Sequence, residues 1–188
     1  MRVIGGSARG RTLKSIPGKQ TRPITDRVKE ALFNILAGEV EGARVLDLFG
    51  GTGAVGIEAL SRGAAHATFV EISGKAYRVL RENLRLTGFT DRAQTIRGDA
   101  FAFLRGQPDA AYDIVYIAPP QYRGMWKKAL EMLDERPEWV AKDGLVIVQI
   151  DPREKEPVSL RHFRQEQERR YGDTVLLFFR KVTPPAAE

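Results

Sequence analysis

The sequence predicts an α/β fold built on a mostly parallel, doubly wound sheet. Short apolar runs alternate with stretches of helical periodicity, which is the pattern of repeated βα units. These runs lack polar alternation, as is typical of parallel strands buried on both faces. The last two extended stretches are separated by a turn too short for a crossover, so they should pair antiparallel at one end of the sheet.

The expected elements follow one another in a regular order. A helix should begin after Thr25, a good N-cap, and end at Gly38. A strand over 43–49 leads through a glycine-rich loop into a helix that ends at Gly63. Further strands are expected over 67–72, 93–98, 112–120 and 144–150, and further helices over 73–88, 99–106 and 124–141, the last interrupted near Pro137. The closing strand pair lies within 163–181, with Tyr171-Gly172-Asp173 at its turn.

Composition excludes several classes of protein. The chain has no cysteine and two histidines, which excludes a disulfide framework, a thiolate nucleophile and a metal site built from these residues. No apolar run approaches the roughly 18 residues that a membrane span needs, and the first residues do not form a signal peptide. We therefore expect a cytoplasmic protein with no metal and no membrane contact.

Positive charge is concentrated at the N-terminal end. Residues 1–29 carry eight Lys or Arg side chains and one Asp, whereas the rest of the chain carries 22 cations and 23 acids. Such a glycine-containing basic arm favours a polyanionic partner, because each neutralised phosphate releases counterions. The alternative interpretation is a solvated, solubilising N-terminus.

The strongest chemical signal is the loop that follows the first expected strand. Its glycines allow a tight turn and a close backbone approach to a ligand, and the next helix begins there with free N–H groups. Gly51, Gly53 and Gly56 also satisfy the G-x-G-x-x-G pattern, and Glu71 stands 20 residues after Gly51, where a dinucleotide site has its ribose-binding acid. A nicotinamide-dependent enzyme is therefore one reading of this loop.

Two carboxylates and the end of the sheet favour a different ligand. Asp47 precedes the loop within the strand, where it would repel a pyrophosphate but attract an ammonium group. Asp99 follows the third strand and is placed to accept from an adenine amino group. No Tyr-x-x-x-Lys motif or catalytic histidine is placed for hydride transfer. With the antiparallel end, these features resemble class I S-adenosylmethionine-dependent methyltransferases, Rossmann-like proteins whose seven-stranded sheet ends in such a hairpin.

Several longer segments carry a narrower resemblance. They are MRVIGGSARGRTLKSIPG, TRPITDRVKEALFNIL, ARVLDLFGGTGAVGIEALSRGA, FVEIS, the proline pair in IAPPQY, and RRYGDTVLLFF. Together they resemble the bacterial 16S rRNA guanine-N2 methyltransferase family from Met1 to about Lys181. The resemblance implies methyl transfer from S-adenosylmethionine to the exocyclic amine of one guanine in 16S rRNA within the assembled small subunit, with S-adenosylhomocysteine as the other product, by a monomeric enzyme.

The resemblance also implies a division of the chain. Residues 1–24 would form a basic RNA-docking extension, residues 25–183 the methyltransferase domain, and residues 184–188 a tail. Two other readings stay open: a methyltransferase acting on another nucleic acid or on a protein amine, and a catalytically silent RNA-binding module that keeps the cofactor fold.

Cofactor-binding residues are assigned by the same resemblance. The cofactor loop is matched by Asp47 and by the loop residues Phe49, Gly50, Gly51, Thr52 and Gly53. Glu71 matches the acid that binds the ribose, Ile72 matches the residue that flanks the adenine, and the adenine site is matched by Asp99 and Ala100. The segment that closes over the methionine end is matched by Arg22, Thr25 and Asp26. A simpler interpretation of Asp99 is the N-cap of a helix.

The fourth-strand motif departs from that family. The usual motif is Asp or Asn, two prolines and an aromatic residue, whereas this chain has Ala118-Pro119-Pro120-Gln121-Tyr122. The backbone carbonyls of Ala118 and Pro119 can still orient the target amine, and positioning is the main requirement of the transfer. We expect Gln121 to supply a replacement acceptor and Tyr122 to stack on the flipped base. The alternative is that both side chains only cover the end of the strand.

The candidate RNA contacts fall in two places. Arg9, Arg11, Lys14 and Lys19 of the arm are candidate phosphate contacts, and Arg123 and Trp126 are candidates for the rim of the guanine pocket. Trp126 has an equally simple alternative, as the core anchor of its helix.

Overall fold

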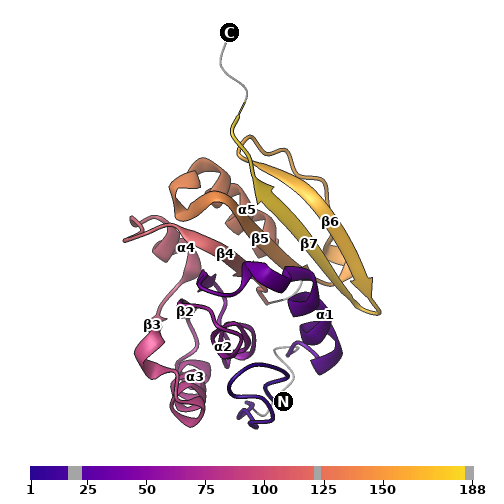
Figure 1. The fold of residues 1–188 in the computed structure, drawn as a ribbon. Helices are drawn as coiled ribbons and strands as arrows, with labels where there is room; N and C mark the ends of the chain where they lie inside the picture. Colours follow the sequence, from indigo (N-terminus) through magenta and orange to yellow (C-terminus); the bar gives the residue numbers. More distant parts are fainter. Residues whose placement is uncertain (17–22, 121–123, 185–188) are drawn as a thin grey trace.

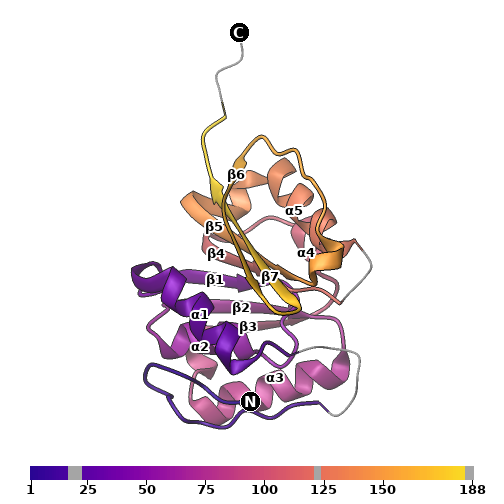
Figure 2. The same ribbon diagram turned by 90° about the vertical axis from the view of Figure 1, so that its right-hand side faces the viewer.

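A single seven-stranded sheet organises the part of the chain that the structure describes. The structure is a computed structural model of the chain, described for residues 1–16, 23–120 and 124–184. The strand order is β3-β2-β1-β4-β5-β7-β6 (Figures 1 and 2). The strands are β1 (Arg44–Asp47), β2 (His66–Glu71), β3 (Ala93–Arg97), β4 (Tyr112–Ile117), β5 (Val140–Ile150), β6 (Phe163–Tyr171) and β7 (Thr174–Lys181). Strands β1 to β5 run parallel, and β7 lies antiparallel between β5 and β6, which confirms the predicted fold class.

Helices cover both faces of this sheet. They are α1 (Asp26–Leu36), α2 (Ala54–Ser61), α3 (Gly74–Thr87), α4 (Ala100–Leu104) and α5 (Met125–Glu135). The apolar residues of α1, α2 and α3 form one buried cluster with one face of the strands, and those of α4 and α5 form a second cluster with the other face (Figures 1 and 2). This double covering explains why the parallel strands are apolar along their length.

Several element boundaries differ from the sequence prediction by a few residues, and two helix ends have a clear physical cause. Helix α1 ends at Leu36, two residues before Gly38, because Ala37 itself takes a positive φ of 42° and Gly38 lies in a following 3-10 turn. The helix expected to reach residue 141 ends at Glu135, since Pro137 disfavours helical backbone at the preceding residue, and β5 already begins at Val140.

The basic arm is packed against the domain. Residues Arg2 and Thr12 form an isolated antiparallel bridge, so the first residues fold back on themselves. Val3, Ala8 and Leu13 are buried in the same apolar cluster as α1 and α2. These arm residues therefore pack as part of the helical layer formed by α1, α2 and α3. That residues 1–24 form a separate RNA-docking unit remains a prediction about function.

The candidate residues gather at one edge of the sheet. The parallel register places the ends of β1, β2, β3 and β4 together at the carboxyl edge, where open α/β sheets bind their ligands. Within the described ranges, no cluster of His, Cys, Asp and Glu is arranged to hold a metal ion. In the same ranges, no helix is long and apolar enough to cross a membrane.

Candidate active site

The glycine loop between β1 and α2 is held by its own backbone. Gly50 N donates to Val70 O at 2.8 Å, and Gly53 N donates to Gly50 O at 2.9 Å. Gly53 has φ of 92°, and a Cβ there would lie 2.5 Å from Leu80 Cδ1 and 2.9 Å from Ile57 Cδ1. Glycine is required at this position for both conformation and space. The loop is thereby fixed against α3 at the start of α2.

Glu71, at the end of β2, presents an immobilised carboxylate beside this loop. Its Oε1 accepts from Gly51 N at 2.8 Å, and its Oε2 accepts from Ser73 N at 2.7 Å. Each oxygen keeps a further lone pair. A carboxylate held in this way is suited to accept hydrogen bonds from a vicinal diol such as a ribose.

Next to it, Ile72 places an apolar side chain in solvent. It is 67% exposed, and it is the one large hydrophobic residue in the described ranges that is classed as exposed. An uncovered apolar side chain beside a diol-binding carboxylate suits the face of a planar base. The expected contact of Ile72 with an adenine stays a prediction.

The third strand brings Asp99 to the same place. Gly98 N donates to Glu71 O at 3.0 Å, which joins the ends of β2 and β3. Asp99 caps α4, because its Oδ2 accepts from Ala102 N at 3.0 Å, so the capping role anticipated for it is present. Helix α4 begins at Ala100 and contacts the glycine loop through Phe49, whose ring lies edge-on to that of Phe101 at 6.0 Å.

Asp47 is the buried acid of the site. Its side chain is 2% exposed, and Oδ1 has no hydrogen-bond partner. Burial raises the pKa of this carboxyl group to about 7, a hydrogen bond from the Gly56 backbone opposes that rise, and the nearby charge of Glu71 adds to it. A cationic ligand group would stabilise the ionised form. The orphaned oxygen therefore fits an ammonium group better than a phosphate.

These groups fit the cofactor implied by the sequence resemblance. Glu71 matches a ribose, Ile72 and Asp99 an adenine, and Asp47 the cationic end of an amino acid. A pyrophosphate would meet the ionisable carboxyl of Asp47 where the glycine loop begins, so the dinucleotide reading fits less well.

The described part of the fourth-strand motif lies beside a buried polar pair. Ala118 is half-buried against the core cluster that contains Tyr116. The Tyr116 hydroxyl donates to Gln149 Oε1 on β5. Burial, together with the charge of Asp47, raises the pKa of Tyr116 well above its usual value. Sequence reasoning missed Gln149, although a polar residue inside the apolar run GLVIVQI was a usable signal.

The proline pair continues the strand toward the surface. Pro119 is half-buried and Pro120 is exposed. Gln121, Tyr122 and Arg123, which were expected to provide the replacement acceptor, the stacking ring and part of the pocket rim, lie outside the described residues.

The segment expected to close over the methionine end begins α1. Thr25 Oγ1 accepts from Val28 N at 3.2 Å and caps the helix. Asp26 pairs with Arg2 of the arm, with 3.3 Å between Oδ2 and Nε. Arg22 lies outside the described residues. Both described residues therefore have structural roles at the start of α1, and their role over the methionine end stays a prediction.

The candidate RNA contacts differ in their availability. Arg9 is exposed, Arg11 donates from Nη1 to Leu86 O at 3.2 Å, and Lys14 pairs with Glu82 at 3.4 Å. Lys19 lies outside the described residues. All three described cations line the arm where it runs past α2 and α3.

Trp126 is buried on α5 beside residues 155–160, and its expected place on the rim of the guanine pocket stays a prediction. Its side chain is 2% exposed, and Nε1 donates to Glu154 O at 3.2 Å. The indole thus packs in the core with its one donor satisfied, as the alternative interpretation has it. Helical spacing of apolar residues on α5 turns it inward.

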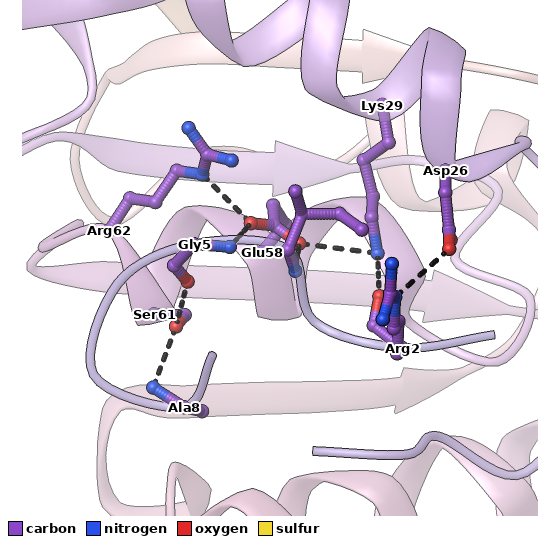
Figure 3. Close-up of polar contacts among 9 residues, drawn as sticks. Arg2, Gly5, Ala8, Asp26, Lys29, Glu58, Ser61 and Arg62 are labelled. Atoms are coloured by element: carbon purple, nitrogen blue, oxygen red, sulfur yellow. Dashed lines mark hydrogen bonds and ion pairs between the residues drawn. The ribbon is translucent and has the colours of Figure 1, made fainter. Parts of the chain in front are cut away.

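A buried charged cluster anchors the beginning of the arm (Figure 3). Glu58 accepts from Ile4 N and Gly5 N, both at 2.9 Å. Lys29, which like Glu58 is 0% exposed, lies 3.2 Å from Glu58 Oε1 and donates to Arg2 O at 2.6 Å. The sequence pattern did not indicate this cluster, because charged residues on amphipathic helices are ordinarily solvated.

Comparison with known proteins places the chain among methyltransferases. The family model described as "Conserved hypothetical protein 95" matches residues 1–180. The "Putative rRNA methyltransferase YlbH" of Bacillus subtilis is 36% identical over 183 residues, covering 96% of this chain and 99% of that protein. The "Ribosomal RNA small subunit methyltransferase D" of Escherichia coli K12 is 39% identical over 149 residues, covering 79% of this chain and 74% of that protein.

The fold agrees with a solved structure of similar sequence. That structure, "Putative methyltransferase yhhF from Escherichia coli", superposes with a TM-score of 0.85 at 34% identity and covers 96% of this chain and 97% of its own. The likeness extends over the arm, the glycine loop and the closing hairpin.

Proposed function

The chain belongs to the Conserved hypothetical protein 95 family of RNA methyltransferases, and on that premise we propose that it methylates the N2 amine of one guanine in 16S rRNA. S-adenosylmethionine is its cofactor. The cofactor part of the proposal rests on the group at the carboxyl edge, namely the immobilised Glu71, the uncovered Ile72 and the unpartnered oxygen of Asp47, and the rRNA part rests on the similarity to rRNA methyltransferases.

Each group has a distinct role in this proposal. Glu71 accepts hydrogen bonds from the ribose hydroxyls, Ile72 and Asp99 hold the adenine, and Asp47 attracts the ammonium group of the methionine end. The loop residues 49–53 bring the backbone close to the ligand, while the N–H groups of Gly50, Gly51 and Gly53 hold the loop in shape by bonding within the protein. Arg22, Thr25 and Asp26 cover the methionine end from the start of α1.

The transfer needs orientation more than acid or base chemistry. When bound, the cofactor supplies a sulfonium methyl, which is already an activated electrophile. The backbone carbonyls of Ala118 and Pro119 accept from the target amine and point its lone pair at that methyl. Such in-line positioning is worth several kcal/mol, up to about 7–11. Gln121 adds a side-chain acceptor, and Tyr122 stacks on the base, a contact worth roughly 1–3 kcal/mol.

The guanine must leave a helical stack or come from a loop to reach this edge. In the proposal, residues 1–24 dock on RNA, with Arg9, Arg11, Lys14 and Lys19 as phosphate contacts, and Arg123 lies at the pocket rim. The assembled small subunit is the expected substrate.

The decisive test follows labelled methyl from S-adenosylmethionine into unmodified small subunits, naked 16S rRNA, tRNA and DNA, with nucleoside analysis of each product. Labelled N2-methylguanosine from small subunits or 16S rRNA supports the proposal. Label in another nucleoside or another substrate contradicts the target. Cofactor binding without any product identifies the silent RNA-binding module.

A variant tests the departure at the fourth-strand motif. Gln121→Ala should lower kcat at least tenfold while the affinity for S-adenosylhomocysteine stays unchanged. The control is Gln94→Ala, an exposed glutamine on the edge strand β3, which should leave both quantities unchanged. A Gln121→Ala protein with the kcat of the parent would remove the proposed acceptor role.

A further inference from the structure

Asn83 holds two distant segments of the chain at once. It lies on α3 and is 0% exposed. Its Oδ1 accepts from Lys14 N at 2.8 Å, and its Nδ2 donates to Lys14 O at 3.0 Å and to Thr52 O at 2.9 Å. One side chain therefore bonds both backbone groups of an arm residue and the carbonyl in the middle of the glycine loop.

The amide of Asn83 is used almost to its capacity. Both N–H donors are engaged, and the carbonyl oxygen accepts a backbone N–H. Rotating the amide by half a turn would set its NH2 against Lys14 N–H and its oxygen against Thr52 O. The hydrogen-bond partners thus fix its orientation, and no aliphatic side chain can replace it without leaving several backbone groups unpaired.

The two segments that Asn83 joins belong to different halves of the proposed reaction. Thr52 stands between Gly51, whose N–H donates to Glu71, and Gly53, which starts α2. Lys14 stands near Arg11, which is tied to the same helix through Leu86 O. One segment is the proposed cofactor loop, and the other carries candidate phosphate contacts.

We propose that Asn83 is a positioning residue that links cofactor binding to RNA docking. A ligand that orders the glycine loop fixes Thr52 O, which fixes Asn83, which in turn fixes the arm at Lys14. By thermodynamic reciprocity, RNA bound to the arm must strengthen cofactor binding by the same factor. The identities of the two ligands rest on the proposed function, whereas the physical link between loop and arm does not.

The other anchors of the arm provide an internal control. Ser61 Oγ accepts from Ala8 N at 2.9 Å and donates to Gly5 O at 2.6 Å. These bonds tie the arm to the last turn of α2 and do not involve the glycine loop (Figure 3). Loss of Ser61 should therefore loosen the arm without breaking the link to the cofactor.

The first experiment uses the unaltered protein and no RNA. Hydrogen exchange is followed with and without saturating S-adenosylhomocysteine. We expect the ligand to slow exchange several-fold at Lys14, whose N–H donates to Asn83, and to slow it less at Gly5 and Ala8, whose N–H groups donate to side chains of α2. Equal slowing of both segments, or none in either, would overturn the link. This outcome does not depend on whether rRNA is the substrate.

The second experiment measures the linkage factor. The affinity for S-adenosylhomocysteine is determined with and without saturating 16S rRNA or small subunits in the parent, Asn83→Leu and Ser61→Ala proteins. We expect a factor of about five or more in the parent and in Ser61→Ala, and a factor close to one in Asn83→Leu. A parent factor of one, or equal factors in both variants, would overturn the proposal.

A milder variant covers the case in which Asn83→Leu does not fold. Asn83→Ser keeps a short polar side chain that cannot span to both Lys14 and Thr52. It should weaken S-adenosylhomocysteine binding about tenfold and reduce the linkage factor together with it. Normal cofactor affinity in Asn83→Ser would argue against positioning of the loop by this side chain. Absence of methyl transfer in the parent would remove the proposed function but not the hydrogen-exchange result.

Discussion

The N-terminal arm and the β6–β7 hairpin are both added to a core of βα units, but they are held in different ways. The hairpin is bonded to β5 along a continuous backbone ladder from Leu145 and Arg180 to Ile150 and Val175. The arm has one isolated bridge and a few backbone bonds within itself, and most of its bonds to the rest of the protein involve side chains of α2 and α3. Backbone N–H and C=O groups of paired strands bond to one another, whereas those of an irregular segment depend more on side chains and on other parts of the chain. The position of the arm should therefore be far more sensitive to single substitutions.

The largest difference in folding stability between variants of the arm and of the hairpin is expected at Glu58, the buried acid that binds the start of the arm. Glu58→Gln leaves Lys29 buried without a counter-charge and should lower the free energy of unfolding by about 3–5 kcal/mol. The matched change in the hairpin is Glu166→Gln, which removes a partly exposed partner of Arg180 and should cost less than about 1 kcal/mol. Denaturant unfolding of both variants measures this contrast, and equal losses would contradict it.

A smaller effect is expected where the arm touches α2 most closely. A Cβ on Gly6, whose φ is 82°, would lie 1.9 Å from the backbone oxygen of Ser61. Gly6→Ala should therefore cost about 2–4 kcal/mol through backbone strain and overpacking and should displace the arm. Gly10→Ala is the control, because Gly10 has a similar φ of 86° but open space around it. Proteolysis of the arm and thermal unfolding distinguish the two, and similar behaviour would refute the close-contact argument.

Asp47, the buried acid of β1, should make cofactor affinity depend on pH in the same way in variants of the arm and of the hairpin. Because its pKa is raised to about 7, Asp47 is increasingly protonated below that pH, and its attraction for a cationic ligand is lost. The affinity for S-adenosylmethionine should fall toward tenfold per pH unit below about 7, or about 1.4 kcal/mol per unit.

Raising the pH affects folding stability through Asp47 in the direction opposite to its effect on cofactor affinity. The folded protein binds this proton more tightly than the unfolded chain does, so this group lowers stability as pH rises from about 4 to 7. Titration calorimetry across pH 5.5–8 checks the binding trend, and Asp47→Asn should flatten it. A steep profile that survives in Asp47→Asn would assign the trend to another group.

The smallest effect is expected at the hairpin turn. Gly172 has φ of 59°, and a Cβ added there would meet no atom within 4 Å, so Gly172→Ala should cost only about 1 kcal/mol. The ladder should hold the turn in place, and cofactor affinity should match that of the parent. A loss of folding stability as large as that of Gly6→Ala would contradict the expected difference between the hairpin, which is held by backbone pairing, and the arm, which is held by side chains.

The same contrast explains what the sequence could predict. Periodicity and turn residues predicted the strands, the helices and the antiparallel hairpin, because these depend on local backbone preferences. The ends were placed to within a few residues, and one of them moved because Ala37 took the positive φ expected of a neighbouring glycine. Pro137 was recognised as an interruption, although a strand rather than more helix follows it.

The sequence predicted only some of the site residues, because the others depend on contacts between distant parts of the chain. Asp47, Glu71 and Asp99 follow strands in a recognisable motif, and the structure brings them to one edge. The partners of Asn83 and Gln149 lie 31 or more residues away, so no local pattern names them, although the polar Gln149 inside an apolar run did mark that position. Trp126 could equally have faced the core or the pocket, and only packing against the chain near Glu154 decides between them.

The outer strand of the hairpin has one further consequence. β6 is an edge strand, and such strands offer unpaired backbone groups to other molecules. Here charged side chains, among them Arg164, Glu168 and Arg169, lie along it, and its pairing is irregular between Gln165 and Gln167. Burying those charges would oppose edge-to-edge association of two sheets. The strand that completes the fold thereby also protects the protein from aggregation.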